Sequence, residues 1–433
     1  MKARGTLDRP PSAVFHAITH VWGREYLDLF LSVCLPNQLA PGNIPALPPG
    51  SRYRILTRSN HVDELDVHPM VHALREVIPV DLVVVEALDR HGDGPYHTEL
   101  MIACHRKATT DILDADAAII MLSADFILSN NALTAVVRRH REGYRAVVNT
   151  GLRLNKESFR QRLDESATAL ATLSSRELVR MALPHLHSHE RSMFADASRF
   201  SKAPVAVHWR VGDEGLLTRC LHLHPLMVDP MRAQPLLRGT NDGAYLAEVC
   251  PDFSRVHVVT DSDELQMFEM TAAQRQVIGV TNAGISAWRA AVVASRCDGL
   301  QLHYWQHHPV RLHTADLDEK WIAATLTSEK FSRQVVRRRP YARLEQRWFR
   351  LAGRIAKRRA RYLKTLQRQR RRIRLERATR WTERQMRTWE RRRPRLRLKQ
   401  IQRPVKLFVH RAVKATRLGL RRIHRRLRLS LPT

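Results

Sequence analysis

The chain has 433 residues, with 73 Lys and Arg against 42 Asp and Glu, which gives a formal net charge of +31. Its 44% content of hydrophobic residues excludes a wholly disordered chain, and no stretch approaches the roughly 20 uncharged apolar residues of a membrane-spanning helix. Five dispersed cysteines without metal-site spacing indicate core thiols in a reducing compartment. The first residues lack the apolar run of a secretory signal, so we expect a cytoplasmic protein.

The charge is concentrated at the C-terminal end. Residues 331–433 hold 38 basic and 4 acidic residues, whereas residues 1–330 hold 35 basic and 38 acidic ones. We therefore predict two parts, a nearly neutral folded domain over 1–330 and an Arg-rich helical tail over 331–433.

Short apolar runs alternate with helix-like stretches through the first half, which is typical of an α/β fold with a mostly parallel sheet flanked by helices. Helices are predicted at Thr98–Leu113 and Ala132–Glu142. The predicted strands are Leu27–Leu35, Tyr53–Thr57, Val80–Leu88, Ala117–Leu122 and Arg145–Val148. Sheets of this kind bind ligands at the carboxyl ends of their strands.

The second half is less regular. Helices are predicted at Glu157–Met181 and Ile285–Ser295. Strands are predicted at Val205–Trp209, Cys220–Val228 and Val256–Thr260. These elements extend the α/β pattern without any internal repeat.

The basic tail contains an apolar stripe at helical spacing. Its members are Leu344, Trp348, Leu351, Ile355, Tyr362, Leu366 and Ile373. Three interpretations compete: a solvated basic extension, a helix on an anionic membrane surface, and binding of nucleic-acid backbones. We favour the membrane surface, which would place the protein peripherally on the inner face of the membrane. A second basic helix is predicted at Val405–Leu427.

Two acidic segments follow predicted strands. Asp125, in Ser123-Ala124-Asp125, could reach a divalent cation that neutralises a nucleotide diphosphate, or could cap the next helix. Asp261 and Asp263 have the same setting after another strand, although Asp263 and Glu264 could instead cap a following helix.

Two further candidates lie between these segments. His222 and His224 would face the same side of a strand and could share a metal, although a structural role is the alternative. Asp242, in the turn-rich segment GTNDG, could act as a base or bind sugar hydroxyls, or could belong to an ordinary turn. No P-loop, GxGxxG, GxSxG or HExxH motif is present.

The order of these pieces resembles a known family. The segments LSVCLPNQLAPGN, YRILT, DADAAIIMLSADFILSNNAL and RRHREGYRAVVNTGLR, followed by RCLHLHPLMVDP and GTNDGAYL, are similar to bacterial glycosyltransferases of the GT-A fold. The resemblance implies a donor site at Pro36, Ser123 and Asp125. It also implies a Mn²⁺ or Mg²⁺ ion held by Asp125 with His222 or His224. Ser123 stands where the family's D-x-D motif has its first acid, and Asp261 with Asp263 would be a second acidic pair.

The resulting hypothesis is a glycosyltransferase that moves a sugar from a nucleotide diphosphate to a surface glycan or a lipid-linked acceptor. Asp242 would take the acceptor's proton. One alternative is a non-enzymatic nucleic-acid-binding protein that acts through the tail. Another is a nucleotidyltransferase, although segment Ala40–Gly50 is Pro-rich where such enzymes have a Gly-rich loop.

Overall fold

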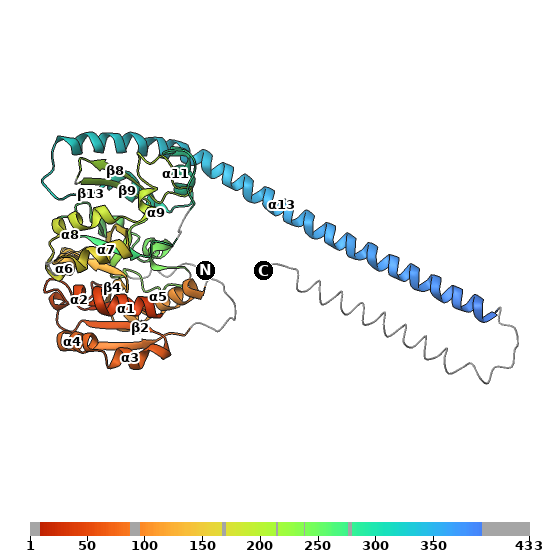
Figure 1. Cartoon of the computed structure of the whole chain (residues 1–433), viewed down its shortest axis with the longest axis horizontal. Helices are drawn as coiled ribbons and strands as arrows, with labels where there is room; N and C mark the ends of the chain where they lie inside the picture. Colours follow the sequence, from red (N-terminus) through yellow and green to blue (C-terminus); the bar gives the residue numbers. More distant parts are fainter. Residues whose placement is uncertain are drawn as a thin grey trace. The chain divides into compact units, whose positions relative to one another are not determined.

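A seven-stranded, mostly parallel sheet lies at the centre of a mixed α/β fold (Figure 1). The computed structural model describes residues 9–86, 96–166, 170–213, 215–237, 239–275 and 279–391. In spatial order the strands are β11 (Val256–Val258), β6 (Ala146–Asn149), β10 (His224–Val228), β4 (Ala118–Ser123), β1 (Phe15–His20), β2 (Arg52–Thr57) and β3 (Val80–Val84). Within this sheet, β10 is antiparallel to both of its neighbours, and the other pairs are parallel.

The fold has two further sheets, each with three strands. The first contains β5 (Phe126–Leu128), β12 (Met267–Thr271) and β7 (Gly151–Asn155). The second contains β13 (Val310–Leu312), β9 (Gly215–Cys220) and β8 (Ala206–Val211). Each of these sheets combines strands that are far apart in the sequence.

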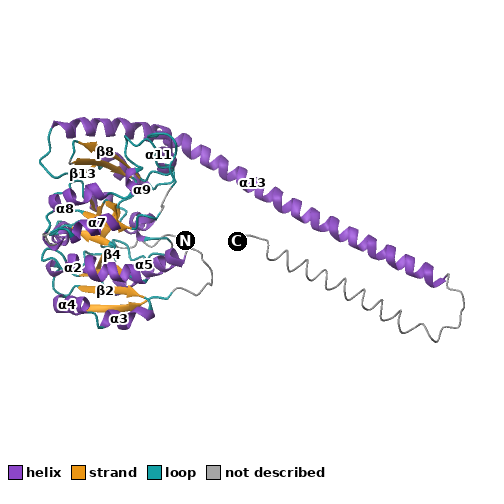
Figure 2. Cartoon of the chain, in the orientation of Figure 1, coloured by secondary structure: helices purple, strands orange, loops and turns teal. Residues whose placement is uncertain are grey.

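Helices surround these sheets, and the strands lie inside them (Figure 2). The α-helices are α1 (Arg24–Leu29), α2 (Leu35–Gln38), α3 (Val62–Asp66), α4 (Pro69–Val77), α5 (Tyr96–Asp114), α6 (Ala132–Arg141), α7 (Lys156–Asp164), α8 (Ser175–Ala182), α9 (Ser188–Arg191), α10 (Leu246–Val249), α11 (Ala287–Ala294), α12 (Gly299–His307) and α13 (Glu319–Arg391). Two π-helical turns are η1 (Phe30–Cys34) and η6 (Asn241–Tyr245). Short 3-10 turns are η2 (Ile44–Ala46), η3 (Ser59–His61), η4 (Leu170–Thr172), η5 (Leu183–His185) and η7 (Phe253–Arg255).

The central sheet is buried on both faces. Along β4, Ile120 and Leu122 belong to one hydrophobic cluster, whereas Ile119 and Met121 belong to another. Successive side chains of a strand point to opposite faces, so an unbroken apolar run fits a strand covered on both sides. A third cluster joins β8 and β9 to α11, α12 and the first part of α13.

The structure corrects the predicted first strand. Residues 27–35 form α1, η1 and the start of α2, and Pro36 lies within α2 rather than in a loop after a strand. Leu29 and five further residues of the segment are buried, and those five recur at helical spacing: Leu27, Phe30, Leu31, Cys34 and Leu35. The first strand is instead β1, whose two histidines and threonine mask its apolar pattern.

Other elements of the first half are confirmed. The predicted strands at Tyr53–Thr57, Ala117–Leu122 and Arg145–Val148 correspond to β2, β4 and β6. In the second half, the single helix predicted at Glu157–Met181 is wrong because α7 and α8 are separate. The single strand predicted at Cys220–Val228 is also wrong, because β9 and β10 belong to different sheets.

Contacts divide the chain into two compact units, Met1–Trp348 and Phe349–Thr433. In the described part of the second unit the backbone is the continuation of α13, and the predicted helix at Val405–Leu427 lies outside the described residues. None of the described helices has an apolar stretch long enough to cross a bilayer.

The first part of α13 packs onto the folded domain, so the predicted boundary at residue 330 can be tested against one at 348. Val335 and Ala342 are completely buried, and Arg339 donates a hydrogen bond to a carbonyl of α11 at 3.1 Å. We expect residues 1–348 to keep the melting temperature of the folded domain. Residues 1–330 should melt several degrees lower, because burial of a Val side chain alone contributes about 1.5 kcal/mol. Equal thermal unfolding of the two truncated proteins would favour the boundary at 330.

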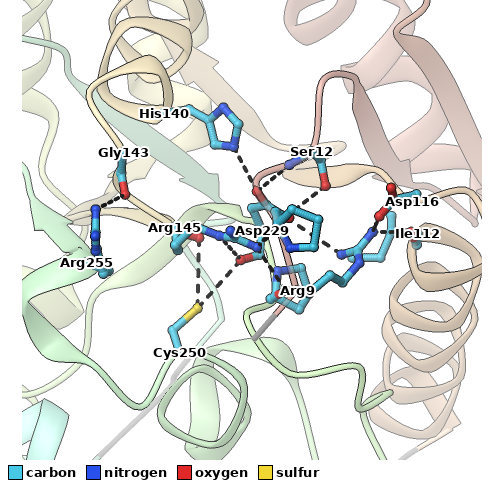
Figure 3. Close-up of polar contacts among 12 residues, drawn as sticks. Arg9, Ser12, Ile112, Asp116, His140, Gly143, Arg145, Asp229, Cys250 and Arg255 are labelled. Carbon is cyan, nitrogen blue, oxygen red and sulfur yellow. Dashed lines mark hydrogen bonds and ion pairs between the residues drawn. The ribbon is translucent and has the colours of Figure 1, made fainter. Parts of the chain in front are cut away.

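A buried network of ion pairs and hydrogen bonds lies at the amino edge of the sheet (Figure 3). Asp229 follows β10 and is fully buried, and it accepts hydrogen bonds from the amide and hydroxyl of Ser12, both at 2.9 Å. His140 and Arg145 pair with the same carboxylate at 2.8 and 3.2 Å. Burial acts to raise the pKa of Asp229, but the bonds from His140 and Ser12 and the charge of Arg145 outweigh it and lower that pKa. This network joins the start of β1 to α6 and β10, which is a structural role.

Candidate functional site

Polar side chains gather at the carboxyl edge of the central sheet, opposite the Asp229 network. His20 ends β1, Ser123 ends β4, and Asp261 comes shortly after β11. Because β10 runs in the opposite direction, its first residue, His224, lies at this same edge. Three strand intervals separate β11 from β4, so Asp261 and Ser123 are roughly 14 Å apart along the edge.

Asp125 occupies a turn between β4 and β5 and is buried. Within the described part of the chain, its Oδ1 atom has no hydrogen-bond partner. Burial and the nearby charge of Glu269 raise the pKa of Asp125 to about 7, although Ser123 and Arg153 oppose the shift. Asp125 is not a helix cap, because Asn131 precedes α6. A partly protonated, buried carboxyl is therefore the feature that the structure places at the predicted donor site.

The two predicted histidine ligands do not meet. His222 is exposed, and its Nε2 lies 3.3 Å from the side-chain amide nitrogen of Gln301 in α12. The Nε2 atom of His224 lies 2.9 Å from the carbonyl oxygen of Met121. The chain leaves β9 before His222 and enters β10 at His224, so the two rings do not share one face of a strand. Among the described residues, Asp125, His222 and His224 form no ligand group.

A histidine cluster that sequence reasoning missed lies beside His224. The rings of His20 and His105 have centroids 5.1 Å apart. Burial, followed by the charges of neighbouring histidines, lowers both pKa values to about 3, so both rings are neutral. His105 accepts a hydrogen bond from the amide of Asn241 at 3.3 Å, and the side chain of the adjacent Asp242 lies outside the described part. Recognition of β1 would have pointed to His20 as a strand-end residue.

A group that could hold a metal ion lies after β11. Asp261, Asp263 and His313 each offer a ligand atom, and these atoms lie within 4.8 Å of one another. Such a group of oxygen and nitrogen ligands suits a divalent cation. The predicted alternative of helix capping by Asp263 and Glu264 is wrong, because strand β12 follows them.

The contacts of His313 direct its ring toward the two aspartates. Its Nδ1 lies 2.7 Å from the carbonyl oxygen of Ala315, which can only accept, so Nδ1 carries a proton. Its Nε2 faces Oδ1 of Asp261 at 2.8 Å and lies 3.9 Å from Oδ2 of Asp263, so the ring is directed at both carboxylates. A carbonyl on the far nitrogen is also the arrangement that orients metal-binding histidines.

Backbone pairing explains how residues far apart in sequence meet here. The amide of Ser262 donates to the carbonyl of Arg311 at 2.9 Å, and the Ser262 hydroxyl accepts from the amide of His313 at 3.1 Å. No local motif links His313 to the two aspartates, so sequence patterns alone do not point to the third ligand. Arg176 of α8 pairs with Asp263 at 2.7 Å, and it lowers the pKa of that carboxyl.

A pocket of about 310 Å³ adjoins this group. Arg180, one helical turn after Arg176, lines the pocket and donates a hydrogen bond to the carbonyl of Thr314, the neighbour of His313. Arg210 and Asp213 contribute a second basic and an acidic side chain to its wall. The volume is at the lower end of the range for small-molecule sites. Two arginines and a carboxylate therefore line one hollow, and Thr314 in its wall is the neighbour of the candidate cation ligand His313.

The comparisons with known proteins identify no family. No family model matches the sequence, and no curated protein matches it significantly. Among solved structures, mouse xyloside xylosyltransferase 1 in its apo form is 9% identical over 36% of this chain, with a TM-score of 0.22. Staphylococcus aureus TarS is 9% identical over 75% of this chain, with a TM-score of 0.28. The chain spans 59% and 43% of the lengths of those two proteins.

Proposed function

We propose that the chain is a glycosyltransferase of GT-A type that moves a sugar from a nucleotide diphosphate to a hydroxyl of a glycan or lipid-linked acceptor. The observation that carries this proposal is the Asp261–Asp263–His313 group with its adjoining pocket, at the carboxyl edge of a mostly parallel sheet. Ligands of such sheets bind at this edge. A charged diphosphate needs compensation there, and the group offers a cation site beside two arginines.

Asp261, Asp263 and His313 would hold the cation, Mn²⁺ or Mg²⁺. When bound, such an ion supplies the positive charge that stabilises a departing diphosphate. Arg176 and Arg180 lie on the same face of α8 and would bind phosphate oxygens.

The rest of the pocket would bind the reacting groups. Its walls would hold the anomeric carbon in line with the acceptor, which is a positioning effect. Asp213 is the carboxylate that lines this pocket and could accept the acceptor's proton. The base role of Asp242 and the donor-site role of Asp125, Ser123 and Pro36 remain predictions. Asp125 lies too far along the sheet edge to share an ion with Asp261.

The proposal predicts a cation-dependent activity that fails when one ligand is removed. Full-length protein with Mn²⁺ and a panel of nucleotide-diphosphate sugars should release nucleoside diphosphate, and a chelator should stop the release. His313→Gln and Asp263→Asn should each lower this rate by about 100-fold, because the charge on the leaving group would be less well compensated. The Mn²⁺-dependent rise in melting temperature should also disappear.

Exposed residues provide matched controls. His72→Gln and Asp66→Asn make the same chemical changes near β3, at the opposite edge of the sheet from β11, and should alter neither measurement. A Mn²⁺-dependent thermal shift that survives His313→Gln would place the cation elsewhere. A normal shift without turnover or binding of any nucleotide sugar would leave a metal site and refute the transferase.

A further inference from the structure

The exposed part of α13 carries a straight apolar stripe. Leu344 and Ile355 are 11 residues apart, as are Leu351, Tyr362 and Ile373 in succession. Eleven residues make just over three helical turns, so these side chains lie along one line of the helix. Each is about half exposed or more, from 47% for Leu351 to 64% for Tyr362. Trp348 lies on the same line and is 69% exposed.

Basic residues surround this stripe. Between residues 349 and 391 the sequence has 17 Lys and Arg and 3 Asp and Glu. In the described part of this segment, Arg372 forms an ion pair with Glu376, which lies one helical turn later, at 3.0 Å. The segment therefore presents a dense positive charge beside an uncovered apolar surface, over a length of about 45 Å from Leu344 to Ile373.

We propose that this segment of α13 binds lengthwise on an anionic lipid surface, with the stripe in the interfacial layer and the arginines on the lipid phosphates. A second copy of the helix would bring together two surfaces with the same high positive charge, which repel each other. A nucleic-acid backbone would satisfy the arginines but leave the stripe in water. A bilayer with acidic headgroups satisfies both features. The inference does not depend on the transferase activity.

Vesicle sedimentation of the full-length protein tests the proposal. At low salt the protein should bind phosphatidylserine-containing vesicles and not pure phosphatidylcholine vesicles. At about 0.5 M salt, where the Debye length is only about 4 Å, a fraction should stay bound through the stripe. In the variant Trp348→Ser/Leu351→Ser/Ile355→Ser, the fraction that stays bound at high salt should fall by about ten-fold or more.

The control variant also replaces three exposed apolar side chains, but these lie outside the stripe. Phe349→Ser/Leu375→Ser/Met386→Ser should keep the salt-resistant fraction. An unchanged melting temperature in both variants would show that the folded domain is intact. Complete release of the wild type at high salt would overturn the proposal, and so would equal losses in the two variants. Tighter binding to single-stranded RNA than to vesicles at every salt concentration would favour nucleic acid.

Discussion

Asp229→Asn is expected to lower the free energy of unfolding by about 3 kcal/mol or more, because it removes one partner of a buried ionic network. The carboxylate is fully buried and pairs with Arg145, whose side chain is only 6% exposed. Without the negative charge, Arg145 would keep a buried positive charge with only carbonyl partners. Chemical denaturation at neutral pH measures the loss.

Because of the same network, we expect the free energy of unfolding to depend on pH in the acid range. The folded-state pKa of Asp229 lies below its unfolded value near 3.8, so its contribution to stability is full above that value. The contribution is lost as the pH falls through the folded-state pKa. Asp229→Asn should therefore flatten the acid limb of the stability curve. Asp116→Asn is the matched control, since this aspartate pairs with Arg9 but its side chain is 71% exposed. An equal effect of the two substitutions would contradict a structural role for the network.

The sequence predicted the middle of the sheet well and its first strand badly. Strand β4 is an uninterrupted apolar run, which only a sheet interior explains at that length. The segment from Leu27 to Leu35 is equally apolar, but its buried residues recur at helical spacing and Asp28 and Ser32 lie on the exposed side. Hydrophobic content without attention to period therefore led to the wrong element.

The candidate site was predictable only where its residues follow a strand in sequence. Asp261 and Asp263 could be recognised from this position, and Asp125 could be placed at the correct edge. His313 could not, because it reaches the aspartates through pairing between segments about 50 residues apart. His222 and His224 were paired on the assumption of one strand, whereas the chain passes between two sheets there. Long-range pairing, which leaves no local pattern, accounts for both errors.

Asp125→Asn is expected to raise the melting temperature at neutral pH, although substitution of a buried residue usually destabilises. The folded-state pKa of about 7 lies above the ordinary value of 3.8, so the folded protein holds more protons than the unfolded chain between these values. Stability due to this group therefore falls as the pH rises from about 4 to about 7. Asn does not titrate and keeps a similar shape, so it avoids the cost of burying a charge near Glu269.

The gain should grow with pH, up to a ceiling of about 4 kcal/mol for a shift of this size. Melting temperatures of wild type and Asp125→Asn should nearly coincide at about pH 4, near the unfolded pKa, and separate by several degrees at pH 8. A constant difference across this range would contradict the raised pKa. Nucleotide-sugar binding by the same variant then decides its role: lost binding with higher stability would mark Asp125 as a donor-site residue whose buried charge is retained for function. Unchanged binding would make it a structural acid, and the donor would be left to the group around His313.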